Sequence, residues 1–180
     1  MVILDGLSEI EYSGDTRIVI GKFEGIHLGH QRLIREITSK NDDLKSVVFT
    51  FSFSSDIYKK NNTRIYSDEV RRRRFEELNV DYLVEYCLTK ENARMEPEDF
   101  ARDILKKRLH CSELYCGPDL SFGYKGRGNV ELLKSLESSL HIKVCVIDKV
   151  KYLGQDISST RIREALSLGD LETAKMMLGR

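Results

Sequence analysis

The loop that follows a short apolar run holds the residues best suited to chemistry in this sequence. It spans Gly21 to His30, with the sequence GKFEGIHLGH, and leads into a helical pattern. Glycines let the backbone turn and approach a ligand closely, and a helix N-terminus presents unpaired N–H groups that favour a phosphate. His27 and His30 are three residues apart, so one turn presents both imidazoles to one point. Such donors stabilise charge that builds on phosphate oxygens, and each is typically worth ~10²–10³ in rate.

Two other interpretations of this loop remain open. A His-x-x-His pair is half of a metal site, but zinc needs three or four ligands, and only His110 and His141 are left, without paired spacing to cysteine. In the second interpretation, the loop is only a structural turn and its histidines have no chemical role. The Gly-x-Gly-x-x-Gly spacing of dinucleotide-binding loops is absent.

The segment Ile157 to Arg163, with the sequence ISSTRIR, forms a second candidate phosphate site. Three hydroxyl residues precede a helical pattern, so one of them caps the helix, and the same N-terminus can hold phosphate oxygens. Arg163 follows Thr160 by one turn and can reach back to the same anion. Alone the segment is typical of an ordinary cap. Its weight comes from its occurrence together with the loop 21–30.

Strand and helix patterns alternate about five times along the chain. This alternation predicts an α/β fold, a Rossmann-like doubly wound sheet of about five parallel strands with helices on both faces. The expected strands are 17–21, 46–53, 82–86, 113–116 and 142–147, and the expected helices are 30–40, 67–78, 97–109, 130–140, 160–168 and 171–178. We interpret the polar stretch 54–63 as a loop. Ligands bind beyond the carboxyl ends of such strands, which directs attention to the loops after Gly21, Phe53, Cys116 and Asp148.

Composition limits the classes of protein to consider. The 180 residues carry 29 basic and 29 acidic side chains, with 41% hydrophobic residues, which predicts one globular domain over 1–180. Zero net charge argues against bulk binding to nucleic acid or membrane, and no apolar run approaches the ~20 residues of a membrane span. The start lacks the pattern of a secretory signal. Four cysteines without a Cys-x-x-Cys pair suggest reduced thiols in the cytoplasm, with a Cys111–Cys116 disulfide as the alternative.

Basic residues cluster at two further places. Arg71 to Arg74 fan around a helix, and Arg71 alone shares the buried side with Phe75. A buried charge needs a partner, so Arg71 makes either a phosphate contact in the site or a salt bridge. Lys125 and Arg127 either approach a ligand phosphate or lie in an exposed loop.

Together the motifs Gly-x-Phe-x-Gly-x-His-x-Gly-His and Ser-Ser-Thr-x-x-Arg resemble those of the nucleotidylyltransferase superfamily. Within it, the chain looks most like the FMN adenylyltransferase module of prokaryotic bifunctional FAD synthetases. The resemblance covers about residues 18–180, and further agreement lies in Thr50-Phe51, Arg64-Ile65, the segment 117–123 and the closing segment 169–180.

The resemblance implies transfer of AMP from ATP to FMN, giving FAD and pyrophosphate, by a single nucleotidylyltransferase domain without the family's riboflavin kinase module. It implies small-molecule substrates, a cytoplasmic location, no nucleic-acid or membrane partner, and Mg²⁺ that accompanies ATP, with no metal ligand assigned. The implied catalytic residues are His27, His30 and Arg163. The implied ATP contacts are Gly21, Phe23, Gly25, Ser158, Ser159, Thr160 and Arg161. The implied flavin or acceptor contacts are Thr50, Phe51, Arg71, Asp119 and Phe122.

The chain departs from the family pattern at two places. Glu24 stands where the family usually has Asp, and Thr50-Phe51 is followed by Ser52 to Ser55 where the family usually has Glu-Pro-His-Pro. The second departure borders the flavin side. Two alternatives therefore stay open: a nucleotidyltransferase that uses another phosphorylated acceptor, and a flavin- or nucleotide-binding paralogue without catalysis.

Overall fold

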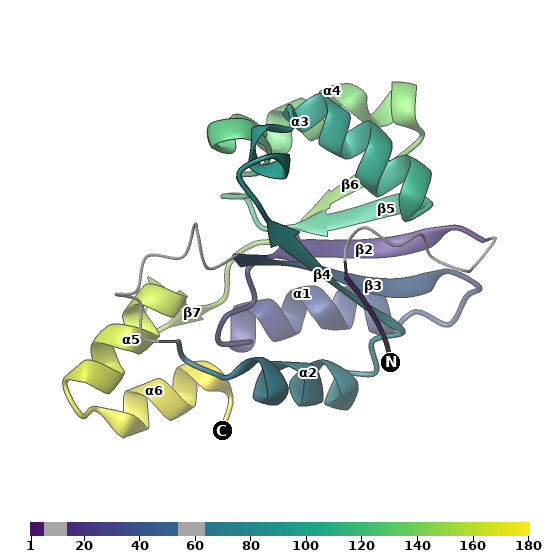
Figure 1. Cartoon of the computed structure of the whole chain (residues 1–180). Coiled ribbons are helices and arrows are strands. Elements are labelled where there is room, and N and C mark those ends of the chain that lie inside the picture. Colours follow the sequence, from purple (N-terminus) through teal and green to yellow (C-terminus); the bar gives the residue numbers. More distant parts are fainter. Residues whose placement is uncertain (6–13, 54–63) are drawn as a thin grey trace.

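Residues 1–5, 14–53 and 64–180 are described by the computed structural model, and a six-stranded parallel sheet lies at its centre (Figure 1). The strands are ordered β1-β4-β3-β2-β5-β6. Their bounds are β1 Val2–Leu4, β2 Thr16–Gly21, β3 Lys45–Phe53, β4 Tyr82–Leu88, β5 Cys111–Cys116 and β6 Lys143–Val146. The chain fills the sheet on one side of β2 and then crosses to the other side at β5. The switch point of the sheet therefore lies between β2 and β5.

Helices cover both faces of the sheet, so the predicted doubly wound α/β fold is confirmed. In Figure 1, α1 (Leu28–Thr38) and α2 (Asp68–Glu77) lie below the sheet. On the upper face lie α4 (Val130–Leu140) and α3 (Pro97–Asp99), which continues into η2 (Phe100–Arg108). The end of η2 has π-type hydrogen bonding, in which the Leu109 N–H donates to the Ile104 carbonyl at 3.1 Å. Short 3₁₀ turns η1 (Asn92–Arg94) and η3 (Tyr124–Gly126) complete this face.

The strand sequences explain why both faces are covered. Successive side chains of a strand point to opposite faces. Ile18 and Ile20 therefore pack with η2 and α4, while Val19 packs with Ile34 of α1 and Phe75 of α2. Because Ile18, Val19 and Ile20 are all buried, the sequence of β2 shows a short continuous apolar run rather than an alternating pattern.

Short strands at two places in the chain were missing from the sequence-based prediction. The strand β1 adds a sixth strand at the edge of the sheet, where Val2 and Ile3 remain 51% and 43% exposed. The antiparallel pair β7 (Lys151–Tyr152) and β8 (Gln155–Asp156) forms a hairpin before the C-terminal helices. Both elements are too short to give a periodic pattern. The loop predicted over 54–63 lies outside the described residues.

The last two helices, α5 (Ser159–Ser167) and α6 (Leu171–Leu178), pack on each other at one end of the sheet (Figure 1). Buried Ile162, Ala174 and Met177 form the contact between them. The Gln31 side-chain amide joins this pair to α1, since it donates to the carbonyls of Leu178 and Ile26, each at 3.0 Å. The start of α5 is thereby held beside the loop that follows β2.

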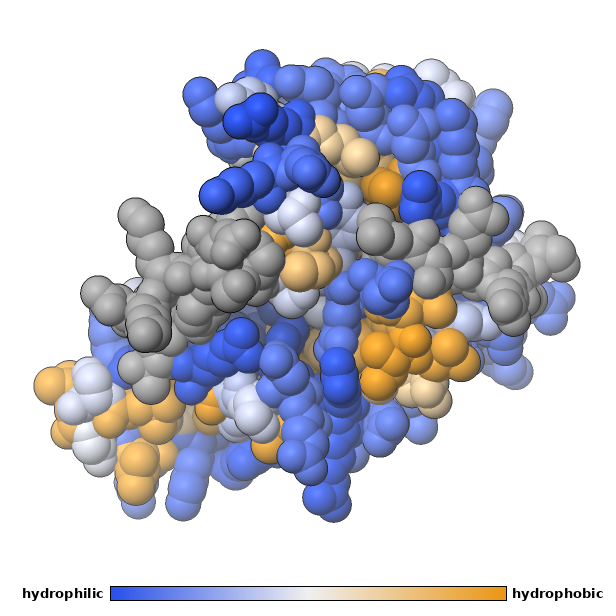
Figure 2. All heavy atoms as spheres, viewed as in Figure 1, coloured by the Kyte–Doolittle hydropathy of each residue, from blue (hydrophilic) through white to orange (hydrophobic). Residues whose placement is uncertain are grey.

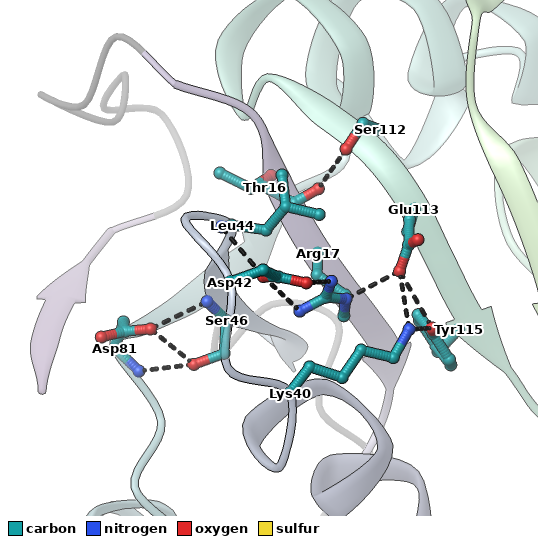
Figure 3. Close-up of polar contacts among 10 residues, drawn as sticks. All are labelled: Thr16, Arg17, Lys40, Asp42, Leu44, Ser46, Asp81, Ser112, Glu113 and Tyr115. Carbon is teal, nitrogen blue, oxygen red and sulfur yellow. Dashed lines mark hydrogen bonds and ion pairs between the residues drawn. The ribbon is translucent and has the colours of Figure 1, made fainter.

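An ionic network around buried Arg17 ties β2 to β5 near the amino ends of the strands (Figure 3). Arg17 is 1% exposed and donates to Glu113 Oε2 at 2.7 Å and to Asp42 Oδ2 at 2.6 Å. Lys40 contacts Glu113 at 3.0 Å and also the hydroxyl of Tyr115, which itself donates to Glu113 at 2.9 Å. These partners hold the pKa of Glu113 down, at about 2.

The surface in Figure 2 is mainly hydrophilic, with hydrophobic areas over α5 and α6 at the lower left and beside the N-terminal strand. The exposed large apolar side chains on the two helices are Leu166, Leu171 and Met176, and Leu168 at the C-cap of α5 is also exposed. Within the described ranges, none of the helices has the length and apolar character needed to cross a membrane.

Candidate active site

A cavity of about 620 Å³ opens at the carboxyl ends of the central strands. It is bordered by the segments that follow β2, β5 and β6 and by the start of α5. The predicted site residues that line it are Gly21, Phe23, His27, His30, Phe51, Arg71, Asp119, Ser158, Ser159, Thr160 and Arg163. The two phosphate motifs, more than a hundred residues apart in the chain, therefore face one space.

The loop after β2 has a strained backbone that the core holds in place. Phe23 and Ile26 have φ angles of 45° and 42°, a left-handed conformation that costs free energy for residues other than glycine. Their side chains are 0% and 3% exposed, so burial in the core offsets this cost. Phe23 packs edge-on against Phe75 and His30, with centroid distances of 6.0 and 4.9 Å. Packing thus fixes the direction of the residues between Phe23 and Ile26.

His27 and His30 form a stacked pair at the entry of α1. Their ring centroids are 3.7 Å apart and their planes 17° from parallel. His27 is also the N-cap of α1, since its Nδ1 accepts the backbone N–H of His30 at 3.4 Å. Neutral His27 therefore carries its proton on Nε2. A side chain on Gly29 would lie 3.2 Å from the His27 ring, so glycine leaves room for this stack.

Both histidines are neutral near pH 7. Burial lowers the pKa of His27 to about 4 and, together with the nearby His27 and Arg71, lowers the pKa of His30 well below its usual value. Among the buried side-chain polar atoms of the described residues, His30 Nδ1 is the one without a hydrogen-bond partner. The pair can thus offer N–H donors to a phosphate without adding positive charge to the cavity.

Arg71 makes a salt bridge, one of the two options that its position on α2 left open. Its guanidinium is 3.0 Å from Asp68 and donates to the Thr50 hydroxyl at 2.9 Å. It also donates to the carbonyls of Phe23 and Lys22, each at 3.2 Å. Although Arg71 borders the cavity, its hydrogen bonds to the Phe23 and Lys22 carbonyls mainly hold the loop after β2 in place.

The start of α5 matches the expected helix cap. The Ser158 hydroxyl accepts the Arg161 N–H at 3.2 Å, and Ser159 and Thr160 begin the helix at the cavity wall. The first N–H groups of a helix have no intrahelical partner. This end of α5 therefore presents N–H and hydroxyl donors to the same space as the histidines.

The two arginines of this segment have different positions. Arg163 lines the cavity and lies 2.6 Å from Glu24. Arg161, expected to contact ATP, points elsewhere and donates to the carbonyls of Tyr152, Gln155 and Asp156 in the β7–β8 hairpin. Residues two positions apart lie about 200° apart around a helix, so the sequence itself predicts that Arg161 and Arg163 point in opposite directions.

Three other residues expected at the site lie behind the cavity wall. Phe122 is 4% exposed and packs on Phe100. The Thr50 hydroxyl is buried between Arg71 and the Lys22 carbonyl. Gly25 contacts Ile65, whose Cδ1 would be 2.9 Å from an added Cβ. These three residues therefore pack behind the lining residues and do not themselves border the cavity.

The cavity lining also includes Glu24, Asp148 and Lys149, for which the motifs predicted no role in the site. Glu24 pairs with Arg163, and Lys149 Nζ is 2.9 Å from Asp119 Oδ2. Asp148 lies beside Lys149 in the segment after β6. The available signal was positional, because a residue after the carboxyl end of a parallel strand is a candidate ligand contact whatever its motif. Within the described residues, no group of three or more His, Cys, Asp or Glu is placed to hold a metal ion.

Comparison with known proteins shows the family to which the sequence is similar. The sequence model of a family described as FAD synthetase matches residues 9–161. A bifunctional riboflavin kinase/FMN adenylyltransferase from Buchnera aphidicola is 32% identical over all of this chain, which spans 59% of that relative. An FAD synthetase from Listeria monocytogenes is 30% identical, with 90% of this chain and 68% of the relative covered.

A solved structure shares the arrangement of the whole chain. The crystal structure of a macrolide-efflux protein from Streptococcus pneumoniae has a TM-score of 0.84 and 27% identity, and the match covers 99% of this chain and 62% of that one. The family match covers both phosphate motifs up to Arg161, and the relatives extend it across the rest of the site. The expectation drawn from the motifs is thus confirmed, and this chain belongs to the FAD synthetase family.

Proposed function

We propose that this chain is an FMN adenylyltransferase, which transfers AMP from ATP to FMN and releases pyrophosphate. Membership in the FAD synthetase family supports this activity. The observation that carries it is the single cavity in which the histidine pair and the start of α5 face one another. Anion donors on two sides of one space suit a triphosphate chain.

The ATP phosphates would lie between these donors. In the proposal, Ser158 to Thr160 and Arg163 hold the β- and γ-phosphates, while His27 and His30 donate to the α-phosphate and the departing pyrophosphate. A phosphate oxygen of FMN attacks the α-phosphorus in line. The new P–O bond forms as the bond to the bridging oxygen breaks, and pyrophosphate leaves with that electron pair.

The residues of the cavity do not need to supply a strong base. The attacking phosphate of FMN is already ionised near pH 7, so catalysis consists of positioning and charge stabilisation. Neutral imidazoles suit this task because they donate hydrogen bonds and do not exchange a proton in the step. The stack at 3.7 Å fixes both rings before substrate arrives.

Magnesium enters this proposal with the nucleotide. Mg²⁺ commonly takes one or two carboxylates and completes its shell with phosphate oxygens and water. The carboxylates that line the cavity are Asp119, Asp148 and Glu24, the last of which pairs with Arg163, and the described residues form no cluster of three metal ligands. This set fits a metal held mainly by the substrate, where Mg²⁺ would neutralise charge on the phosphates.

The acceptor would enter on the side of β3 and β5. Phe51, Leu120 and Ile147 give that side of the cavity apolar surface, and Asp119 and Lys149 give it polar groups. A flat ring system with a polar edge fits such a lining. A cytoplasmic location belongs to the same proposal, since all four cysteines are free thiols, as in a reducing compartment.

The direct test is incubation with ATP, Mg²⁺ and FMN, with FAD followed by chromatography and pyrophosphate by a coupled assay. We expect equal amounts of both products. Phosphopantetheine, nicotinamide mononucleotide and glycerol phosphate replace FMN in parallel, and riboflavin serves as the control for kinase activity. Product from another acceptor and none from FMN would favour the alternative transferase. Ligand binding without pyrophosphate release would favour the non-catalytic paralogue.

Variants then test the roles of the residues. His30→Ala and Arg163→Ala should each lower FAD formation ~10²-fold while circular dichroism shows an intact fold. FAD formation near the wild-type rate in both variants would contradict the assignment.

A further inference from the structure

An ion pair joins the two phosphate motifs across the cavity. Arg163 Nη1 lies 2.6 Å from Glu24 Oε2, although the residues are 139 positions apart. The side chains are 27% and 26% exposed, so the pair is partly shielded from solvent. The strained turn between Phe23 and Ile26 fixes the backbone that carries Glu24. This contact therefore has a defined place in the site and is not one of many exposed surface pairs.

The guanidinium of Arg163 retains donors for a ligand. An arginine has five N–H donors. Among the described residues, the recorded acceptors are Glu24 on Nη1 and the Thr160 hydroxyl, 3.4 Å from Nη2. These two bonds leave three N–H groups, which suffice for a bidentate contact with a phosphate.

Arg71 in the cavity lining and Arg161 on the same helix as Arg163 differ in this respect. Arg71 directs its donors to Asp68, Thr50 and two backbone carbonyls. Arg161 directs its donors to the carbonyls of the β7–β8 hairpin. Both are used to hold protein segments. Arg163 combines a place in the cavity lining with unused donors, and the group that orients it is Glu24.

We propose that Glu24 is a positioning residue, whose carboxylate holds Arg163 so that its remaining N–H groups meet the ATP phosphates. This inference rests on the proposed adenylyltransferase function. Without the pair, a long side chain must be ordered when ATP binds, and ordering one such side chain weakens affinity about two- to tenfold. Glu24 lowers that cost by fixing the guanidinium in advance.

A carboxylate near a triphosphate also repels it, and this effect has the opposite sign. If repulsion dominated, removal of the charge would tighten ATP binding. If orientation of Arg163 dominates, removal weakens it. The direction of the change in affinity therefore decides between the two effects.

The test measures binding of Mg²⁺ and ATP by calorimetry, without an acceptor, for the wild type, Glu24→Gln, Arg163→Ala and the double variant. We expect Glu24→Gln to weaken ATP binding about fivefold and to raise KM for ATP with little change in kcat. In the Arg163→Ala background, Glu24→Gln should cause no further loss, since residues that act through one contact are not additive. Glu77→Gln, in a surface pair with Arg74, is the matched control that should leave Kd unchanged.

Unchanged or tighter binding by Glu24→Gln would overturn the proposal, and so would an equal loss in the Arg163→Ala background. Glu24→Asp provides a second variant if Glu24→Gln does not fold. It keeps the charge and shortens the reach, so positioning predicts weaker ATP binding and repulsion alone predicts no change. The proposed function fails separately, if the wild type binds ATP and makes no FAD.

Discussion

The imidazole of His27 lies 3.7 Å from that of His30, centroid to centroid, and its Nδ1 accepts the His30 backbone N–H. One side chain thus caps α1 and forms half of the histidine pair that we propose to bind phosphate. The cap fixes the ring and its tautomer, and the stack leaves both rings in the cavity lining. Helix structure and chemistry depend on the same atoms here.

His27→Asn separates these two roles. Asparagine is a good N-cap, so the helix should keep its stability, while the imidazole N–H is lost. We expect FAD formation to fall ~10²-fold with a small change in Tm. His27→Ala is the comparison, since it should lose the activity and also about 1 kcal/mol of stability. Activity of His27→Asn close to wild type would show that the cap alone matters.

Gly29→Ala should lower activity without unfolding the chain. Alanine favours a helix over glycine by about 1 kcal/mol, but its Cβ would lie 3.2 Å from the His27 ring. The ring must shift, and the stack with His30 is disturbed. Thermal unfolding and steady-state kinetics together check this, and a loss of both stability and activity would contradict it.

Arg161→Ala and Arg163→Ala should differ in kind. Arg161 bonds to the β7–β8 hairpin, so its removal should lower the free energy of unfolding by about 1–3 kcal/mol. Arg163→Ala should instead lower FAD formation ~10²-fold and weaken ATP binding, with little change in the free energy of unfolding. Urea unfolding and ATP titration of both variants provide the measurement. Equal effects of the two substitutions on the free energy of unfolding and on ATP binding would contradict the different roles of Arg161 and Arg163.

Stability should fall as the pH decreases from about 6.5 to 4. The pKa of His27 is about 4 in the folded chain, against an ordinary value of 6.5, so the unfolded chain binds more protons in this window. Stability is complete above 6.5, and His27 alone accounts for a loss of about 3 kcal/mol by pH 4. Urea titrations at several pH values test this. His27→Asn should show a shallower slope, and an unchanged slope would contradict the assignment.

The ionic network around Arg17 should cause a second loss of stability, at lower pH. Glu113 has a pKa of about 2 against the usual 4.5, so its stabilisation is complete above pH 4.5 and is lost as the pH falls toward 2. Glu113→Gln should lower stability near pH 7 by about 1–3 kcal/mol because buried Arg17 loses a partner. It should also remove this acid-dependent loss. Glu77→Gln, at an exposed pair, should change stability by less than about 1 kcal/mol.

The sequence determined the alternation of strands and helices, since buried apolar runs and helical spacing are local properties. The loop 21–30 and the segment 157–163 could likewise be predicted as phosphate sites from sequence, because glycines, hydroxyl residues and helix starts carry that chemistry themselves. The short elements β1 and β7–β8 escaped prediction, since two or three residues have no period and form only against a partner.

Tertiary structure decided which of these residues share a cavity. The low pKa of both histidines comes mainly from burial in the folded chain, and the pairing of Glu24 with Arg163 joins residues 139 positions apart. Packing also places Phe122, Thr50 and Gly25 behind the cavity wall, whereas the family resemblance implied that they contact a ligand. Burial and long-range contacts depend on the whole fold, so no local pattern encodes them.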